Sequence, residues 1–211
     1  SISTAVGFKA LENQNFTTAT NSHNTALGYN TGNDLTTGIY NTFVGSIAGD
    51  AITDADYNTA LGAQALTTDT LGSRSVAVGF GALENQNFTT ATNSHNVAMG
   101  YEAGHSITTG TQNTLIGNAT GDALTDANLN TAVGYAALSS DVKGTRSTAF
   151  GMGALQNQNF TTALASNNVA VGYYAGQQVT TGRYNVFVGA NAGDANTGGD
   201  YNVAIGPDAM S

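Results

Sequence analysis

The chain repeats one five-residue phrase twelve times, and the spacing of the copies restricts its fold more than any other feature. The phrase reads Asn or Ser, Thr or Val, a small or apolar residue, a large apolar residue and Gly. The phrase glycines are Gly7, Gly28, Gly45, Gly62, Gly79, Gly100, Gly117, Gly134, Gly151, Gly172, Gly189 and Gly206. Their numbers differ by 21, 17, 17 and 17 in turn, and this order recurs, so the units form a higher, 72-residue period.

A 17-residue unit cannot bury a hydrophobic face alone, whereas stacking on similar neighbours creates a continuous core. We therefore expect one solenoid over residues 1–211. Its super-repeats cover 3–74, 75–146 and a truncated 147–211. Because the pattern starts and stops within a repeat and has no polar capping unit, we expect a segment of a longer fibre.

The phrase alternates with a period of two, as in Asn24–Gly28, where Thr25 and Leu27 share one side. Helical spacing over ten or more positions is absent, and β-branched residues are abundant. These features predict an all-β parallel β-solenoid, or β-roll, of about twelve 17- or 21-residue turns. We expect a second, shorter strand with an apolar plug in the second half of each unit. The 21-residue units should bulge around the phenylalanines Phe16, Phe88 and Phe160.

The two sides of the phrase strand are expected to have different roles. We expect the second and fourth positions to fill the interior, and the third position, which is mostly Ala, to face outward. An exposed apolar row is an aggregation liability, so another copy of the chain should cover it, in a homotrimer. The expected contact residues are Ala26, Phe43, Ala60, Ala98, Leu115, Ala132, Ala170, Phe187 and Ala204. The first-position Asn row predicts either stacked amide ladders or tight corners with positive φ.

Composition excludes several functions. The 211 residues carry a net charge of −9, which argues against binding to nucleic acid or insertion into an anionic membrane surface. The absence of Cys excludes disulfides and thiol chemistry. The apolar runs are all far shorter than the roughly 18 residues that a transmembrane helix needs, so no such helix is expected.

The titratable residues follow the repeat and form no unique constellation, so we expect no catalytic residue, no metal and no cofactor. His23 and His95 are equivalent, and the third copy has Asn167 there. Loop aspartates could offer oxygen ligands to Ca²⁺, although acceptance of backbone N–H groups is the favoured interpretation. These aspartates are Asp50, Asp54, Asp56, Asp122, Asp126 and Asp194.

Repeated tyrosines are the candidate contacts to a glycan or protein receptor, because the ring combines an apolar face with a polar hydroxyl. They are Tyr29, Tyr101 and Tyr173 after the phrase glycine, and Tyr40, Tyr57, Tyr184 and Tyr201 before the phrase Asn. Packing over neighbouring turns is the alternative role for these rings.

The phrases NTALG, SVAVG, NVAMG and NVAIG resemble the head repeats of trimeric autotransporter adhesins, which form a left-handed parallel β-roll. The longer segments NTAVGYAALSS at 130–140 and TTGRYNVFVG at 180–189 resemble repeat arrays of phage and bacterial tail fibre proteins. This resemblance implies a homotrimer, an extracellular location on a virion or a bacterial surface, and attachment to a receptor. The 17- or 21-residue repeat is longer than that of the usual adhesin head.

We therefore expect a structural, adhesive fibre segment without enzymatic activity. Two alternatives stay open: a fibre-borne glycan-degrading enzyme and an ice-binding β-solenoid. The ice-binding alternative rests on a stacked threonine column that includes Thr25, Thr42 and Thr59. It requires those hydroxyls to face outward on a flat surface, whereas their replacement by Val in other turns favours an interior row.

Overall fold

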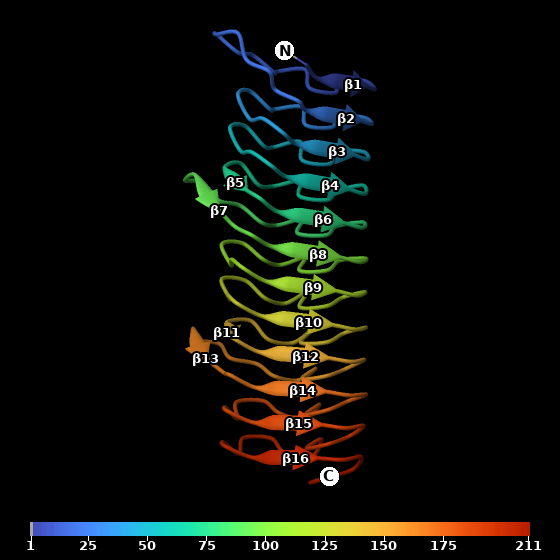
Figure 1. Ribbon diagram of the computed structural model, residues 1–211, viewed down its shortest axis with the longest axis vertical. Coiled ribbons are helices and arrows are strands. Elements are labelled where there is room, and N and C mark those ends of the chain that lie inside the picture. Colours follow the sequence, from blue (N-terminus) through green and yellow to red (C-terminus); the bar gives the residue numbers. More distant parts are fainter. Residues whose placement is uncertain (1) are drawn as a thin grey trace.

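A computed structural model describes residues 2–211 as one column of stacked turns, with the two chain ends at opposite ends of the column (Figure 1). All elements in this range are strands, and twelve of them form a single sheet. The predicted parallel β-solenoid of about twelve turns is thus confirmed. The twelve strands, in spatial order, are β1 (Thr4–Val6), β2 (Thr25–Leu27), β3 (Thr42–Val44), β4 (Thr59–Leu61), β6 (Val76–Val78), β8 (Val97–Met99), β9 (Thr114–Ile116), β10 (Thr131–Val133), β12 (Thr148–Phe150), β14 (Val169–Val171), β15 (Val186–Val188) and β16 (Val203–Ile205).

Each strand of this sheet pairs in parallel with the same three positions of the next turn. Ala26 of β2, for example, lies beside Phe43 of β3, and Phe43 lies beside Ala60 of β4. A spacing of about 4.8 Å per turn makes the sheet on the order of 55 Å long.

The phrase glycine follows each strand where adjacent turns come closest. Gly117 has φ +137°, and a Cβ added there would lie 2.5 Å from the carbonyl oxygen of Gly134 in the next turn. A side chain at this column would collide with the backbone of the next turn everywhere except in the last turn, at Gly206, which explains why the repeat ends in Gly.

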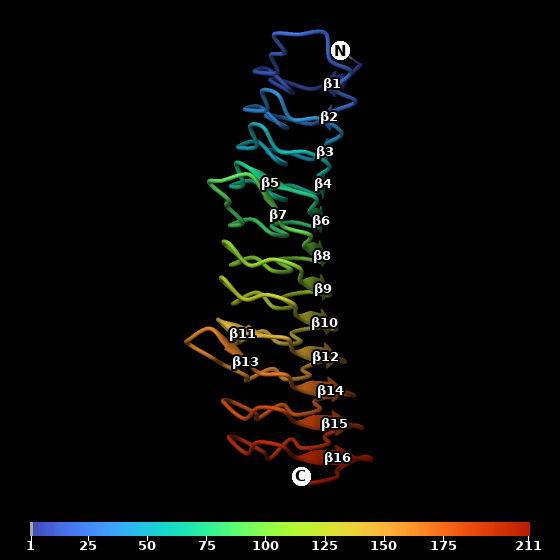
Figure 2. The same ribbon diagram turned by 60° about the vertical axis from the view of Figure 1, so that its left-hand side comes forward.

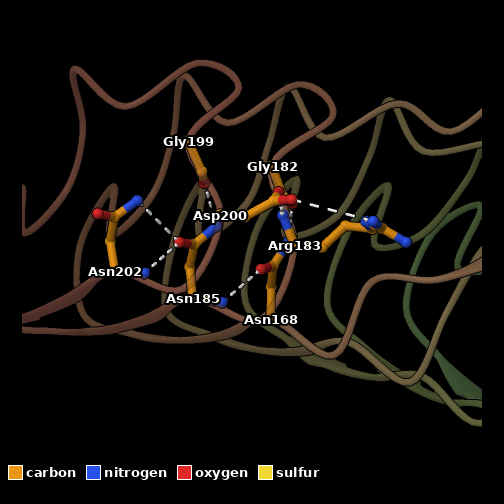
Figure 3. Close-up of polar contacts among 7 residues, drawn as sticks. All are labelled: Asn168, Gly182, Arg183, Asn185, Gly199, Asp200 and Asn202. Carbon is orange, nitrogen blue, oxygen red and sulfur yellow. Dashed lines mark hydrogen bonds and ion pairs between the residues drawn. The ribbon is translucent and has the colours of Figure 1, made fainter.

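Buried asparagines at the first phrase position connect successive turns. The side-chain oxygen of Asn168 accepts a hydrogen bond from the backbone N–H of Asn185 at 2.9 Å, and Asn185 does the same for Asn202 at 2.8 Å (Figure 3). The Asn185 side chain also donates to the carbonyl oxygen of Gly199 at 2.8 Å. The ladder prediction is confirmed. The positive φ lies one residue earlier, as at Tyr184 (φ 59°), so the corner prediction is wrong for Asn itself.

The 21-residue turns bulge from one side of the column, as predicted (Figures 1 and 2). The short strands β7 (Thr92–Asn93) and β13 (Leu164–Ala165) lie in the second and third bulges and pair with β5 (Gly72–Ser73) and β11 (Gly144–Thr145). A second strand in every unit was predicted. Within residues 2–211 it occurs only at these two places, because the other corners are closed by turns and isolated hydrogen bonds between turns.

The interior is narrow, and the third phrase position fills it. Ala26, Phe43, Ala60, Ala98, Leu115, Ala132, Ala170 and Phe187 are fully buried within the single chain, and Ala204 is nearly so. The second and fourth positions point outward instead. The predicted orientation is therefore wrong, and these nine residues have no surface left with which to contact another copy.

Volume compensation explains this orientation. The ring of Phe43 lies against Gly32 and Gly49, where an added Cβ would come within 2.9 Å of the ring. Both glycines occupy the fourth place after a phrase glycine, and Leu66 occupies that place where the interior is lined by Ala60. A large residue at one site is thus matched by Gly at the other. The predicted plugs are confirmed from Leu11 to Val179, since Leu35, Leu66 and their equivalents there are buried, but the prediction is wrong for Met210 in the last turn, which is exposed.

Candidate functional site

The outward side of the twelve-stranded sheet is a continuous uncharged surface, here called the sheet face, in which an apolar column lies beside a column of Thr and Val. It consists of the second and fourth phrase positions of every turn, where all residues are Thr, Val, Leu, Ile, Met or Phe. Its most exposed large members are Val6, Leu27, Leu61, Met99, Phe150, Val203 and Ile205. Three residues of strand are about 10 Å long, so the flat area is about 500 Å². An exposed apolar column that runs through such an area commonly marks an interaction site.

The seven candidate tyrosines are all exposed and lie in two columns that border the sheet face. Tyr29, Tyr101 and Tyr173 follow the strands, and Tyr40, Tyr57, Tyr184 and Tyr201 precede them at the corner with positive φ. The fold therefore brings the two groups to opposite edges of one surface.

At the corner before the strands, the tyrosine rings stack on one another. Tyr40 and Tyr57 are 5.1 Å apart between centroids, with 2° between the ring planes. The His23 ring stacks on the Tyr40 ring with 5.0 Å between their centroids, and the Arg74 guanidinium carbon lies 5.6 Å from the centroid of the Tyr57 ring. Because these rings cover one another, they present edges and hydroxyls to solvent, and few free faces for a sugar ring.

The other column contains similar pairs. Tyr29 stacks on Phe8 and Tyr101 stacks on Phe80, each at 5.6 Å between centroids. Packing over neighbouring turns, the alternative given to these tyrosines, is thus observed for six of the seven, whereas the Tyr173 ring lies against its chain neighbour Tyr174 at 4.3 Å between centroids. It leaves their outer edges available for contact.

A buried polar network occupies each junction between super-repeats. Asp69 accepts hydrogen bonds from the backbone N–H groups of Gly72 and Phe88, both at 3.0 Å, and from the Gln86 amide at 2.5 Å. Burial raises the pKa of Asp69, and these donors oppose the rise. Asp141 repeats the arrangement with Gln158. Since the donors surround these carboxylates, they serve the structure and are not free to act on a substrate.

The candidate calcium ligands do not converge. Within residues 2–211, no group of three or more His, Cys, Asp or Glu side chains could hold a metal ion. Asp56 accepts a hydrogen bond from the backbone N–H of Ile39 at 2.8 Å, so the favoured interpretation is confirmed for this residue. Asp54 accepts from the Thr37 hydroxyl instead, and Asp50 and Asp122 each have one buried carboxylate oxygen without a hydrogen-bond partner. Burial, together with the negative charge of Asp34, raises the pKa of Asp50 to about 6.

Residue analysis alone missed two parts of these surfaces. It placed the sheet face inside the coil, although the match between Phe43 and its two glycines is visible in the sequence. It also missed Arg74 and Arg183 as partners of the corner tyrosines. Their positions in the repeat were the available signal, because Arg74 directly precedes the first-position Ser75 and Arg183 directly precedes the corner residue Tyr184.

Comparison with protein-family models, with curated proteins and with solved structures finds no match to this chain. Residues 2–211 contain no helix with the length and apolar character needed to cross a bilayer.

Proposed function

We propose that this chain is a structural, adhesive fibre segment that assembles as a homotrimer through the sheet face. The observation that carries the proposal is the sheet face itself, because it is uncharged over twelve turns and contains an unbroken apolar column at the fourth position, although the chain has a net charge of −9. Water contact along this apolar column is unfavourable, and a copy of the same chain presents a surface of matching length. With the bordering aromatic columns, the area approaches the roughly 800 Å² that each partner contributes to a stable interface.

The assembled rod attaches a virion or a bacterial cell to a receptor on a host or other surface. Edges of stacked tyrosines and the bulges recur along the rod, so three chains present each weak contact several times. Avidity then rises without a tight single site. An extracellular location on a tail fibre or cell surface accords with this role and with the resemblance of the phrases to adhesin and tail fibre repeats.

Sedimentation equilibrium of the purified protein tests the assembly. The expected mass is three times the 21.3 kDa of one chain. Ile116→Asp introduces a charge at the centre of the sheet face and should yield monomers, whereas Thr109→Asp, in an exposed segment outside the phrase, should leave the trimer intact. A monomeric wild-type protein would refute the proposed assembly.

Adhesion is tested with beads that carry the protein so sparsely that a contact with a cell involves one assembled rod or one monomer, because a densely coated bead would be multivalent with either. The beads are washed over bacterial or eukaryotic cells. Beads with wild-type protein should be retained, and beads with Ile116→Asp should be released because the avidity is lost. Equal retention of both would contradict the multivalent mechanism.

Ice binding is the second candidate function. The threonine column was expected to face the interior of the coil, but it faces outward on the sheet. The neighbouring fourth-position column argues against it, since its side chains vary from Val to Met99 and Phe150 and do not form a flat surface. Thermal hysteresis in a solution of the protein would support ice binding, and its absence would exclude it.

A further inference from the structure

A groove lies beneath the third bulge and has a volume of about 400 Å³. It forms where the bulge segment 160–164 projects beyond the corners that lead into β15 and β16 (Figure 1). Its volume lies within the range of small-molecule binding sites. The first bulge has a smaller groove of about 260 Å³, which is formed by the bulge residues themselves.

Gly198 opens this groove. The equivalent residue one 72-residue period earlier is Asp126, and two periods earlier it is Asp54. Asp54 fills the space with its carboxylate, which accepts a hydrogen bond from the Thr37 hydroxyl. In the third copy, a Cβ added at Gly198 would lie 3.7 Å from the hydroxyl oxygen of Thr181, which is the equivalent of Thr37. The substitution by Gly therefore empties the space and leaves the Thr181 hydroxyl facing it.

Arg183 and Asp200 place a donor and an acceptor side by side in the groove (Figure 3). The backbone N–H of Arg183 donates to Asp200 at 2.7 Å, which fixes the carboxylate. The guanidinium and the carboxylate are 3.9 Å apart, beyond hydrogen-bond distance, and both side chains are about one-third exposed. The guanidinium also lies 5.6 Å from the Tyr184 ring, which orients it. Its N–H groups can thus donate to a bound molecule.

The fold does not require these side chains. Ile39 and Thr111 occupy the place of Arg183 in the other two copies, and Thr20 and Thr92 occupy that of Leu164. Arg183 and the exposed Leu164 are therefore specific to the third groove.

We propose that this groove binds a neutral saccharide through two adjacent hydroxyl groups. A sugar hydroxyl both donates and accepts, so one can donate to Asp200 while its neighbour accepts from Arg183. Thr181 adds a further polar contact, and Leu164 offers an apolar surface to the C–H groups of the ring. An anionic sugar is disfavoured by Asp200 and by the net charge of −9. The inference rests on the proposed adhesive function and names its ligand class and its place on the rod.

Saturation-transfer NMR with the methyl glycosides of glucose, galactose and mannose tests this site. At least one of them should receive saturation from the wild-type protein. Arg183→Thr and Gly198→Asp each restore a residue found in another copy, so both variants should keep the fold, which circular dichroism checks. Each should weaken binding by about tenfold or more, because a charged hydrogen bond or the open space is lost. Asp126→Gly is the matched control: it removes the equivalent carboxylate in the second copy, where Thr111 stands in the place of Arg183, and should add no binding.

Two results would overturn the inference: no transfer to any of the three glycosides, or transfer that both variants leave unchanged. The bead assay separates this inference from the proposed function. If beads with Gly198→Asp are retained as well as wild-type beads, the adhesion of the rod does not depend on this groove and the fibre function stands, while saturation transfer decides whether the groove binds a saccharide. If wild-type beads are not retained, the adhesive function fails, and saturation transfer still reports on the groove.

Discussion

Replacement of Asn113 by Ala measures how much the buried amide ladder contributes to stability. The Asn113 side-chain oxygen accepts a hydrogen bond from the backbone N–H of Asn130 at 3.0 Å, and its amide donates to the carbonyl oxygen of Ala127 at 2.9 Å. The residue is fully buried, so water cannot replace it. The Ala variant leaves one N–H and one C=O without partners, each at a cost of about 1–3 kcal/mol. We expect the free energy of unfolding to fall by about 2–6 kcal/mol.

Urea denaturation followed by circular dichroism measures this loss, and hydrogen exchange locates it at the Asn130 amide, which should lose protection. Asn202→Ala is the matched control. Asn202 lies in the last turn, where its amide donates to Asn185 at 3.1 Å and no further ladder residue follows within residues 2–211. Its loss should be about 1 kcal/mol or less. Equal losses for the two variants, or continued protection of the Asn130 amide, would refute the ladder energetics.

Two further predictions concern the glycine column and the partly buried carboxylates. Gly117→Ala should destabilise the protein by more than about 3 kcal/mol, because backbone strain combines with a collision against Gly134. The control is Gly206→Ala, which has φ +119° and no atom within 4 Å of the added Cβ, so it should cost only the strain of about 1–3 kcal/mol. Equal melting temperatures of the two variants would contradict the collision. The folded protein holds a proton on Asp50 up to about pH 6, above the ordinary pKa of 3.8, so the free energy of unfolding should rise as the pH falls from 7 towards 4. The full rise in pKa corresponds to about 3 kcal/mol, which solvent screening reduces to about 1 kcal/mol. Asp50→Asn should remove this part of the pH dependence in urea titrations, and a profile like that of the control Asp54→Asn would show that Asp50 is not its source.

Much of the fold was predictable because the repeat restricts it strongly. The 17- or 21-residue period requires stacked turns, and the two-residue alternation requires strands. The bulges around Phe88 and Phe160 and the plugs such as Leu35 follow from the positions at which copies differ in length or in side-chain volume.

The direction of the phrase side chains could not be obtained from the alternation alone. Both sides of the strand are apolar, so a period of two separates two rows without stating which row lies inside. The interior width decides this, because Ala60 fits opposite Leu66, whereas Phe43 needs Gly32 and Gly49 beside it.

The candidate sites depended still more on the stacked structure. The tyrosines were recognised by their recurrence, but their mutual stacking depends on the distance between turns. The groove at Gly198 and Arg183 depends on three successive turns, which bring together side chains that are far apart in the chain. The amino-acid order thus establishes the repeated backbone path, because Gly, Asn and chain length act locally. Exposed surfaces arise only when the turns stack, since each is lined by side chains from several turns.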